Sequence, residues 1–157
     1  MRVLSQRFLF VAACAYLALG LGAGLAYREL TKHAGLPDGQ PLQLGVLHTH
    51  LLTLGFLASL LFLVLDRVVH IGERKLFPVF FWVYNAGLLL ASAMMAVHGI
   101  LALDGPVDSP AVAGMAGMGH IILTIGLIVL MVIVGQSVWN RPPAVVNSER
   151  ESESERS

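Results

Sequence analysis

The chain has 157 residues, of which 56% are hydrophobic and only 13% charged, and its mean hydropathy is +0.75. A soluble domain typically carries about 25% charged residues, so this composition indicates a membrane protein. The formal net charge is zero, which excludes a basic protein that binds nucleic acid. The single cysteine, Cys14, excludes an internal disulfide and a cysteine-rich zinc module.

Four apolar stretches reach the length of about 20 residues that a membrane-spanning helix needs. They cover residues 8–27, 44–65, 76–103 and 111–139, and none has a charged side chain in its interior. The connections between them are short and polar, so neighbouring helices must run antiparallel. The sequence therefore predicts an all-α integral membrane protein, an up-down-up-down four-helix bundle over residues 1–139.

The first stretch has two interpretations. Arg2 and Arg7 before an apolar run also suit a cleavable signal peptide. The run is about 20 residues long, however, against 7–15 for the apolar part of a signal peptide. Gly20 and Gly24 form a small-xxx-small pair that favours helix packing. We expect this stretch to be retained as a membrane helix, with cleavage as the alternative.

Basic residues predict the orientation of the bundle. With the N-terminus inside, the outer side receives only Arg28 and Lys32. The cytoplasmic side receives the other eight, which are Arg2, Arg7, Arg67, Arg74, Lys75, Arg141, Arg150 and Arg156. By the positive-inside rule, both termini lie in the cytoplasm. Residues 140–157 end in alternating Glu, Ser and Arg and are predicted to be a disordered cytoplasmic tail.

Four of the six histidines fall inside the predicted spans: His48, His50, His98 and His120. At about 1.5 Å per residue, all four lie roughly 6–13 Å along their helices from the outer surface. Polar residues within a membrane face the bundle interior and mark function by default. We expect the four imidazoles to gather in one cofactor or metal site near the outer face. The competing interpretation is that each makes an interhelical hydrogen bond.

The residue types around the histidines favour some cofactors over others. Imidazoles with no buried carboxylate beside them suit haem, copper or zinc better than calcium or magnesium. Arg28 and Lys32 lie just above this layer and are candidates to pair with haem propionates. The same two helices that carry His98 and His120 also carry four methionines, Met94, Met95, Met115 and Met118. Thioethers suit Cu(I), so copper is the alternative to haem. The methionines could equally be filling the core of the bundle.

The spacing of His48 and His50 limits the geometry of a site. Residues two apart on a helix point about 200° apart, so the two rings cannot both face one site from a regular helix. Either only one of them is a ligand, or each serves a different centre, or the helix is distorted there.

Three histidine motifs carry a family resemblance. They are Leu47-His48-Thr49-His50-Leu51-Leu52-Thr53-Leu54-Gly55-Phe56, Val97-His98-Gly99-Ile100 and Gly119-His120-Ile121-Ile122-Leu123-Thr124. Over residues 8–139 the chain resembles a family of small four-span bacterial membrane proteins of unknown function, which implies the bacterial inner membrane.

A more distant resemblance is to the catalytic subunit of haem-copper oxidases. There a His-x-His pair, similar to His48 and His50, supplies axial ligands to two haems from opposite faces. The stretch from Gly119 and His120 is similar to the oxidase helix that carries the opposing ligand. The oxidase's copper-site histidines and its tyrosine motif are missing, so the resemblance implies at most a b-type haem that passes electrons or senses a gas.

Three functions follow from these observations. The first is a b-type haem protein for electron transfer, or for binding a gas or quinol, with ligands among His48, His50, His98 and His120. The second is a copper or zinc site of the same histidines, and the third is a non-catalytic scaffold or assembly protein. Covalent c-type haem is excluded because Cys-x-x-Cys-His is absent. We expect a redox or binding protein rather than a stand-alone enzyme, with the lipid bilayer and a membrane redox partner or second copy as partners.

Overall fold

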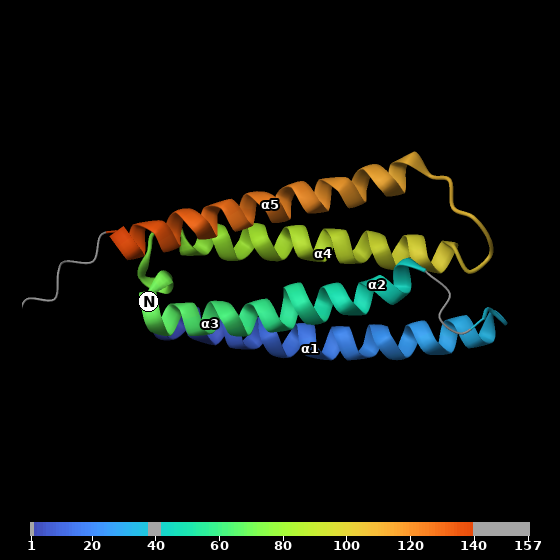
Figure 1. Ribbon diagram of the computed structural model, residues 1–157, viewed down its shortest axis with the longest axis horizontal. Coiled ribbons are helices and arrows are strands. Elements are labelled where there is room, and N and C mark those ends of the chain that lie inside the picture. Colours follow the sequence, from blue (N-terminus) through green and yellow to red (C-terminus); the bar gives the residue numbers. More distant parts are fainter. Residues whose placement is uncertain (1, 38–41, 140–157) are drawn as a thin grey trace, which may run out of the picture.

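The computed structural model describes residues 2–37 and 42–139, which form an antiparallel bundle of four membrane-length helices (Figure 1). The second of these is built from three consecutive segments, one of them π-helical. In chain order the elements are α1 (Arg2–His33), α2 (Gln43–His50), π-helical η1 (Leu51–Leu57), α3 (Ala58–Val69), the 3-10 turn η2 (Ile71–Glu73), α4 (Phe77–Leu101) and α5 (Pro110–Trp139).

The predicted fold class is confirmed. The described residues hold four helices that are long and apolar enough to cross a membrane, and they alternate in direction along the bundle (Figure 1). The chain is therefore a multi-pass membrane protein surrounded by lipid. The predicted tail, residues 140–157, lies outside the described residues.

Two helices extend further than the predicted apolar spans. α1 continues to His33 rather than ending at Tyr27, so Arg28 lies on a helix and not in a loop. The helix ends where Gly35 adopts a positive φ of 66° and the N–H of Leu36 reaches back to the carbonyl of Thr31 at 3.0 Å. Hydropathy marks where a helix leaves the apolar layer, but a left-handed residue of this kind marks where it ends.

The second membrane helix also extends past its predicted apolar span, which ended at residue 65. α3 instead continues to Val69, and His70 ends it in the left-handed conformation with φ 58° and ψ 42°. Asp66 lies inside the helix and is fully buried. It accepts hydrogen bonds from Gln6 Nε2 at 2.9 Å and from the N–H of Gly72 at 2.6 Å. A buried carboxylate is tolerated here because α1 and η2 supply its partners.

The core differs between the two halves of the bundle. Near the end that holds the N-terminus, large aromatic rings pack together: Phe62 meets Phe80 at 5.1 Å and Tyr84 at 5.2 Å. Towards the other end, α4 and α5 approach closely through small residues. A Cβ on Gly119 would come 2.6 Å from the backbone nitrogen of Ala91. This close approach fixes the register of the two helices beside the histidines.

The helices pair as two hairpins. α1 packs along α2, η1 and α3, whereas α5 packs mainly along α4, and α2 joins the two hairpins through α4. Within these elements, no Cα of α2 or η1 lies within 8 Å of a Cα of α5. Side chains alone therefore meet across the space between α2 and α5.

Candidate cofactor site

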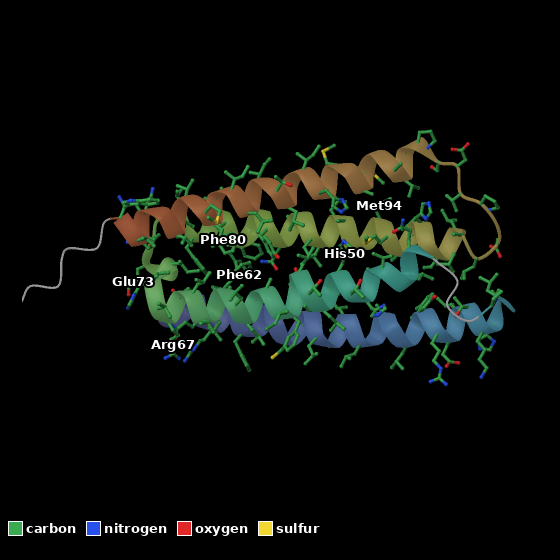
Figure 2. The ribbon with its side chains drawn as sticks, viewed as in Figure 1. His50, Phe62, Arg67, Glu73, Phe80 and Met94 are labelled. Atoms are coloured by element: carbon green, nitrogen blue, oxygen red, sulfur yellow. The ribbon has the colours of Figure 1, made fainter. Side chains whose placement is uncertain are left out.

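His50 and His120 meet across that space. His50 is the last residue of α2 and His120 lies in α5, and their ring centroids are 6.3 Å apart with the ring planes at 83°. His50 is half-buried and His120 is exposed to the surroundings of the bundle. Figure 2 labels His50 between the two hairpins. Two imidazoles from separate hairpins are thus brought to one place, as the sequence predicted for these two residues.

Both rings are held by their own helices in the same way. Nδ1 of His50 lies 3.1 Å from the carbonyl oxygen of Val46, and Nδ1 of His120 lies 2.8 Å from that of Ala116. A carbonyl oxygen only accepts hydrogen bonds, so each neutral ring carries its proton on Nδ1. This leaves the lone pair of Nε2 free on both rings. Histidine ligands of metals commonly have this arrangement, with the second nitrogen donating to a carbonyl or carboxylate.

The separation of the rings is within the reach of one metal ion. A metal–imidazole bond is about 2.0–2.1 Å long, so two imidazoles that share one ion have ring centroids roughly 5–6.5 Å apart. The observed 6.3 Å falls in this range.

The helix is distorted directly after His50, whereas His48 and His50 themselves both lie in the regular α-helix α2. The segment Leu51–Leu57 is π-helical, and π-helical segments are rare and frequent at functional sites. Its carbonyls find other partners: Tyr84 Oη of α4 donates to the carbonyl of Leu54 at 2.7 Å. Gly55 is buried against the ring of Tyr16 of α1. Side chains of α4 and α1 therefore contact the π-helical segment directly.

His48 faces a different helix from His50. A Cβ on Gly24 of α1 would lie 3.8 Å from Cβ and Cγ of His48, so this ring packs towards α1, whereas His50 reaches α5. Its Nδ1 is buried and has no hydrogen-bond partner within the described residues. The structure does not bring His48 to the pair, which agrees with the 200° divergence predicted from the helix period.

His98 lies further towards the end of α4 than the pair. Gly119 packs on Ala91, so His120 stands near the level of Ala91, and from residue 91 to residue 98 the helix advances roughly 10 Å. Gly99 next to it packs on Leu44, in the first turn of α2. Nδ1 of His98 is also buried without a partner in the described part of the chain. The structure therefore places His98 apart from the ring of His120.

The remaining candidate residues lie in other surroundings. Arg28 is 76% exposed on α1, with its Nε 3.9 Å from Glu29, and its pairing with a propionate stays a prediction. Met94 is buried in α4, while Met118 of α5 is 55% exposed. No group of three or more His, Cys, Asp or Glu side chains within residues 2–37 and 42–139 is placed to hold a metal ion.

The sequence interpretation missed the backbone groups that orient the pair. The carbonyls of Val46 and Ala116 each lie four residues before their histidine, a spacing that brings two residues onto one face of a helix. Thr124 repeats the pattern by donating to the carbonyl of His120 at 2.8 Å. The carbonyl four residues before each histidine could therefore have indicated, from the sequence, what holds the ring in place.

Comparison with known protein families finds a family that matches this chain. The family model described as "Protein of unknown function (DUF2871)" matches residues 6–137, which is most of the chain. The chain belongs to the DUF2871 family. The match confirms the predicted resemblance to an uncharacterised family and spans all four helices, so His50 and His120 both lie within the DUF2871 region. No curated protein and no solved structure matches the chain.

Proposed function

We propose that this DUF2871 protein is a membrane-embedded b-type haem protein in which His50 and His120 would hold the haem iron. One observation carries the proposal: the two rings are 6.3 Å apart, and each has Nδ1 on a carbonyl of its own helix. The pair thus offers two free Nε2 atoms on rings that lie close enough for one iron to be held by both. No Cα of α2 lies within 8 Å of a Cα of α5, so only side chains separate the two helices there.

The donor set fits haem better than a tetrahedral metal site. A structural zinc site needs four protein ligands, and no third His, Cys, Asp or Glu joins the pair in the described ranges. Cys14 is the only cysteine, so the porphyrin would be held by axial imidazoles alone, as in b-type proteins. The opposed directions of His48 and His50 support the comparison with the His-x-His pair of haem-copper oxidases.

Electron transfer is the function that two imidazole ligands favour. When bound, haem would supply one-electron redox chemistry, and His50 and His120 would hold it from two separate helices. The chain's own contribution is to fix the rings. The carbonyls of Val46 and Ala116 hold the Nδ1 protons, which orients each imidazole.

Copper is the second candidate, and one observation favours it. Met94 is buried in α4 and lies at a similar position along the bundle to His50 (Figure 2). A thioether with two imidazoles suits Cu(I). This candidate differs from haem in its expected readouts, because it requires stoichiometric copper, no Soret band and loss of the metal in Met94→Leu.

The distribution of basic residues supports a location for the protein. We place the protein in the bacterial inner membrane with both termini in the cytoplasm, because eight of the ten Lys and Arg residues then lie inside. The histidine pair then lies in the outer half of the bilayer, where it could exchange electrons with a membrane redox partner.

An absorption spectrum of detergent-purified protein from haem-replete cells tests the proposal. The starting protein is expected to show a Soret band that shifts on reduction with dithionite. His50→Ala and His120→Ala should each remove most of the haem, because one imidazole cannot hold it alone. His48→Ala and His98→Ala are the matched controls and should keep the Soret band. Colourless starting protein, or equal haem loss in all four variants, contradicts this assignment.

A further inference from the structure

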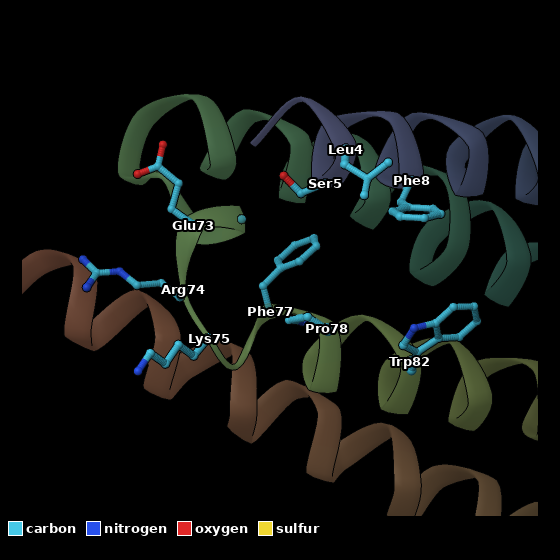
Figure 3. Close-up of a pocket in the computed structure, with 10 residues that line it drawn as sticks. Leu4, Ser5, Phe8, Glu73, Arg74, Lys75, Phe77, Pro78 and Trp82 are labelled. Carbon is cyan, nitrogen blue, oxygen red and sulfur yellow. The ribbon is translucent and has the colours of Figure 1, made fainter. Parts of the chain in front are cut away.

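A groove of about 400 Å³ lies at the end of the bundle opposite the histidine pair (Figure 3). Its apolar walls come from the first two turns of α1 and of α4. They include Leu4 and Phe8 on one side and Phe77, Pro78 and Trp82 on the other. The segment from η2 to α4 closes one end with Glu73, Arg74 and Lys75. The groove therefore has apolar walls along its length and charged residues at one end.

Tertiary contacts build this groove, so it is a defined part of the fold. The buried carboxylate of Asp66 receives the amide of Gln6 and the N–H of Gly72, which ties α1 to η2. Nε of Arg74 donates to the hydroxyl of Ser137 in α5 at 3.0 Å, which fixes the charged end.

The aromatic wall is equally fixed. The ring of Phe8 packs on Phe81 at 5.8 Å, and Phe77 stacks on the same ring at 6.2 Å. Phe77 is only 5% exposed, whereas Trp82 is 67% exposed. The groove thus has a rigid floor and an indole that stands open to the lipid.

The charged end is cationic. Figure 3 shows that the side chains of Arg74 and Lys75 extend beyond the η2–α4 connection, away from the aromatic walls, as does that of Glu73. The two cations therefore lie past the end of the groove, where the headgroup of a lipid lies when its acyl chain points towards the middle of the bilayer. Lys75 has no hydrogen bond or ion pair within the described residues and is exposed. Two further exposed cations, Arg7 and Arg67, lie at the same end of the bundle, on α1 and α3. A ligand for this groove must combine an apolar chain with an anionic group.

We propose that this groove binds an anionic phospholipid, with an acyl chain along the aromatic walls and the headgroup phosphate at Arg74 and Lys75. Three features support a lipid over a peptide or a soluble anion. The groove lies at the end of membrane-spanning helices, its walls are apolar, and Trp82 stands where indoles usually mark the membrane interface. Basic pockets between transmembrane helices recognise anionic headgroups in this way, and each basic residue near the surface strengthens lipid association about fivefold. The site is independent of the haem proposal.

Trp82 provides a direct test. The sequence holds two tryptophans, so Trp139→Phe leaves Trp82 as the sole fluorophore. The full-length variant is placed in vesicles of equal parts phosphatidylglycerol and phosphatidylcholine, with bromines on the acyl chains of one lipid or the other. Brominated phosphatidylglycerol is expected to quench Trp82 at least twice as strongly as brominated phosphatidylcholine.

Substitutions at the charged end identify the cause of that preference. Lys75→Gln should bring the quenching ratio close to one, and Arg74→Lys, which keeps the charge but loses the bond to Ser137, should preserve it. Arg67→Gln removes a cation at the same end but outside the groove and should leave the ratio unchanged. Equal quenching by the two lipids in the starting variant overturns the proposal, as does a ratio that Lys75→Gln does not change.

Discussion

The hydroxyl of Tyr84 in α4 donates to the carbonyl of Leu54 in η1 at 2.7 Å. Leu54 lies one turn after His50, inside the π-helical segment, where the ladder of i→i−4 hydrogen bonds is interrupted. The bond therefore joins the two hairpins at the distorted turn beside the histidine pair. It also satisfies a carbonyl that lies among apolar side chains.

Tyr84→Phe should lower the free energy of unfolding by about 1 kcal/mol. Removing a hydrogen bond costs about 0.5–1.5 kcal/mol in general, and interhelical bonds in membranes average about 0.6 kcal/mol. Denaturation of the detergent-solubilised protein in increasing SDS measures the change. An unchanged midpoint in SDS would mean that the π-helical segment does not depend on this bond.

A second interhelical bond joins α1 to α4, because Tyr16 Oη donates to Asn85 Oδ1 at 2.6 Å. We expect a double-mutant cycle of Tyr16→Phe and Asn85→Ala to give a coupling energy of about 0.6–1.7 kcal/mol. The same SDS denaturation measures all four proteins of the cycle. Strictly additive effects would show that the two side chains do not stabilise each other.

The close approach of α4 and α5 depends on Gly119. Gly119→Leu should destabilise the bundle by about 1–3 kcal/mol, the usual cost of overpacking, because its Cβ would meet the backbone of Ala91. It should also reduce cofactor content, since His120 is the next residue. Gly117→Leu is the matched control, because a Cβ at Gly117 has nothing within 4 Å. Similar losses in both variants, measured by thermal denaturation and the Soret band, would contradict this packing.

The buried carboxylate of Asp66 stabilises the end of the bundle that holds the N-terminus. Asp66→Ala leaves the amide of Gln6 and the N–H of Gly72 without an acceptor. Each unsatisfied buried group costs about 1–3 kcal/mol, so the loss should exceed that of an exposed carboxylate. Asp108→Ala is the control, since Asp108 is exposed and its removal should change stability by less than about 0.5 kcal/mol. Equal effects on the unfolding midpoint would show that Asp66 is not structurally important.

The membrane spans could be predicted because each apolar run is long enough by itself to require a helix. The ends of the helices could not. The end of α1 depends on the left-handed Gly35, and the end of α3 depends on buried partners for Asp66 that come from α1 and η2. Both are contacts or conformations that a hydropathy pattern does not contain.

The histidine pair was predictable only in part. The helix period predicted that His48 and His50 point to different sides, and the structure places them towards α1 and α5. The depth of His98 depended on the register of α4 against α5, which is set by the contact of Gly119 with Ala91. That register is a property of two packed surfaces and cannot be read from either helix alone.

The two rings of the pair stand on different hairpins, and this determines when a site between them can be completed. His50 leaves the ribosome 70 residues before His120 (120 − 50 = 70). A site that needs both rings therefore cannot be completed before α5 has been synthesised. A chain truncated before α5 would keep the first hairpin but lack the second ring.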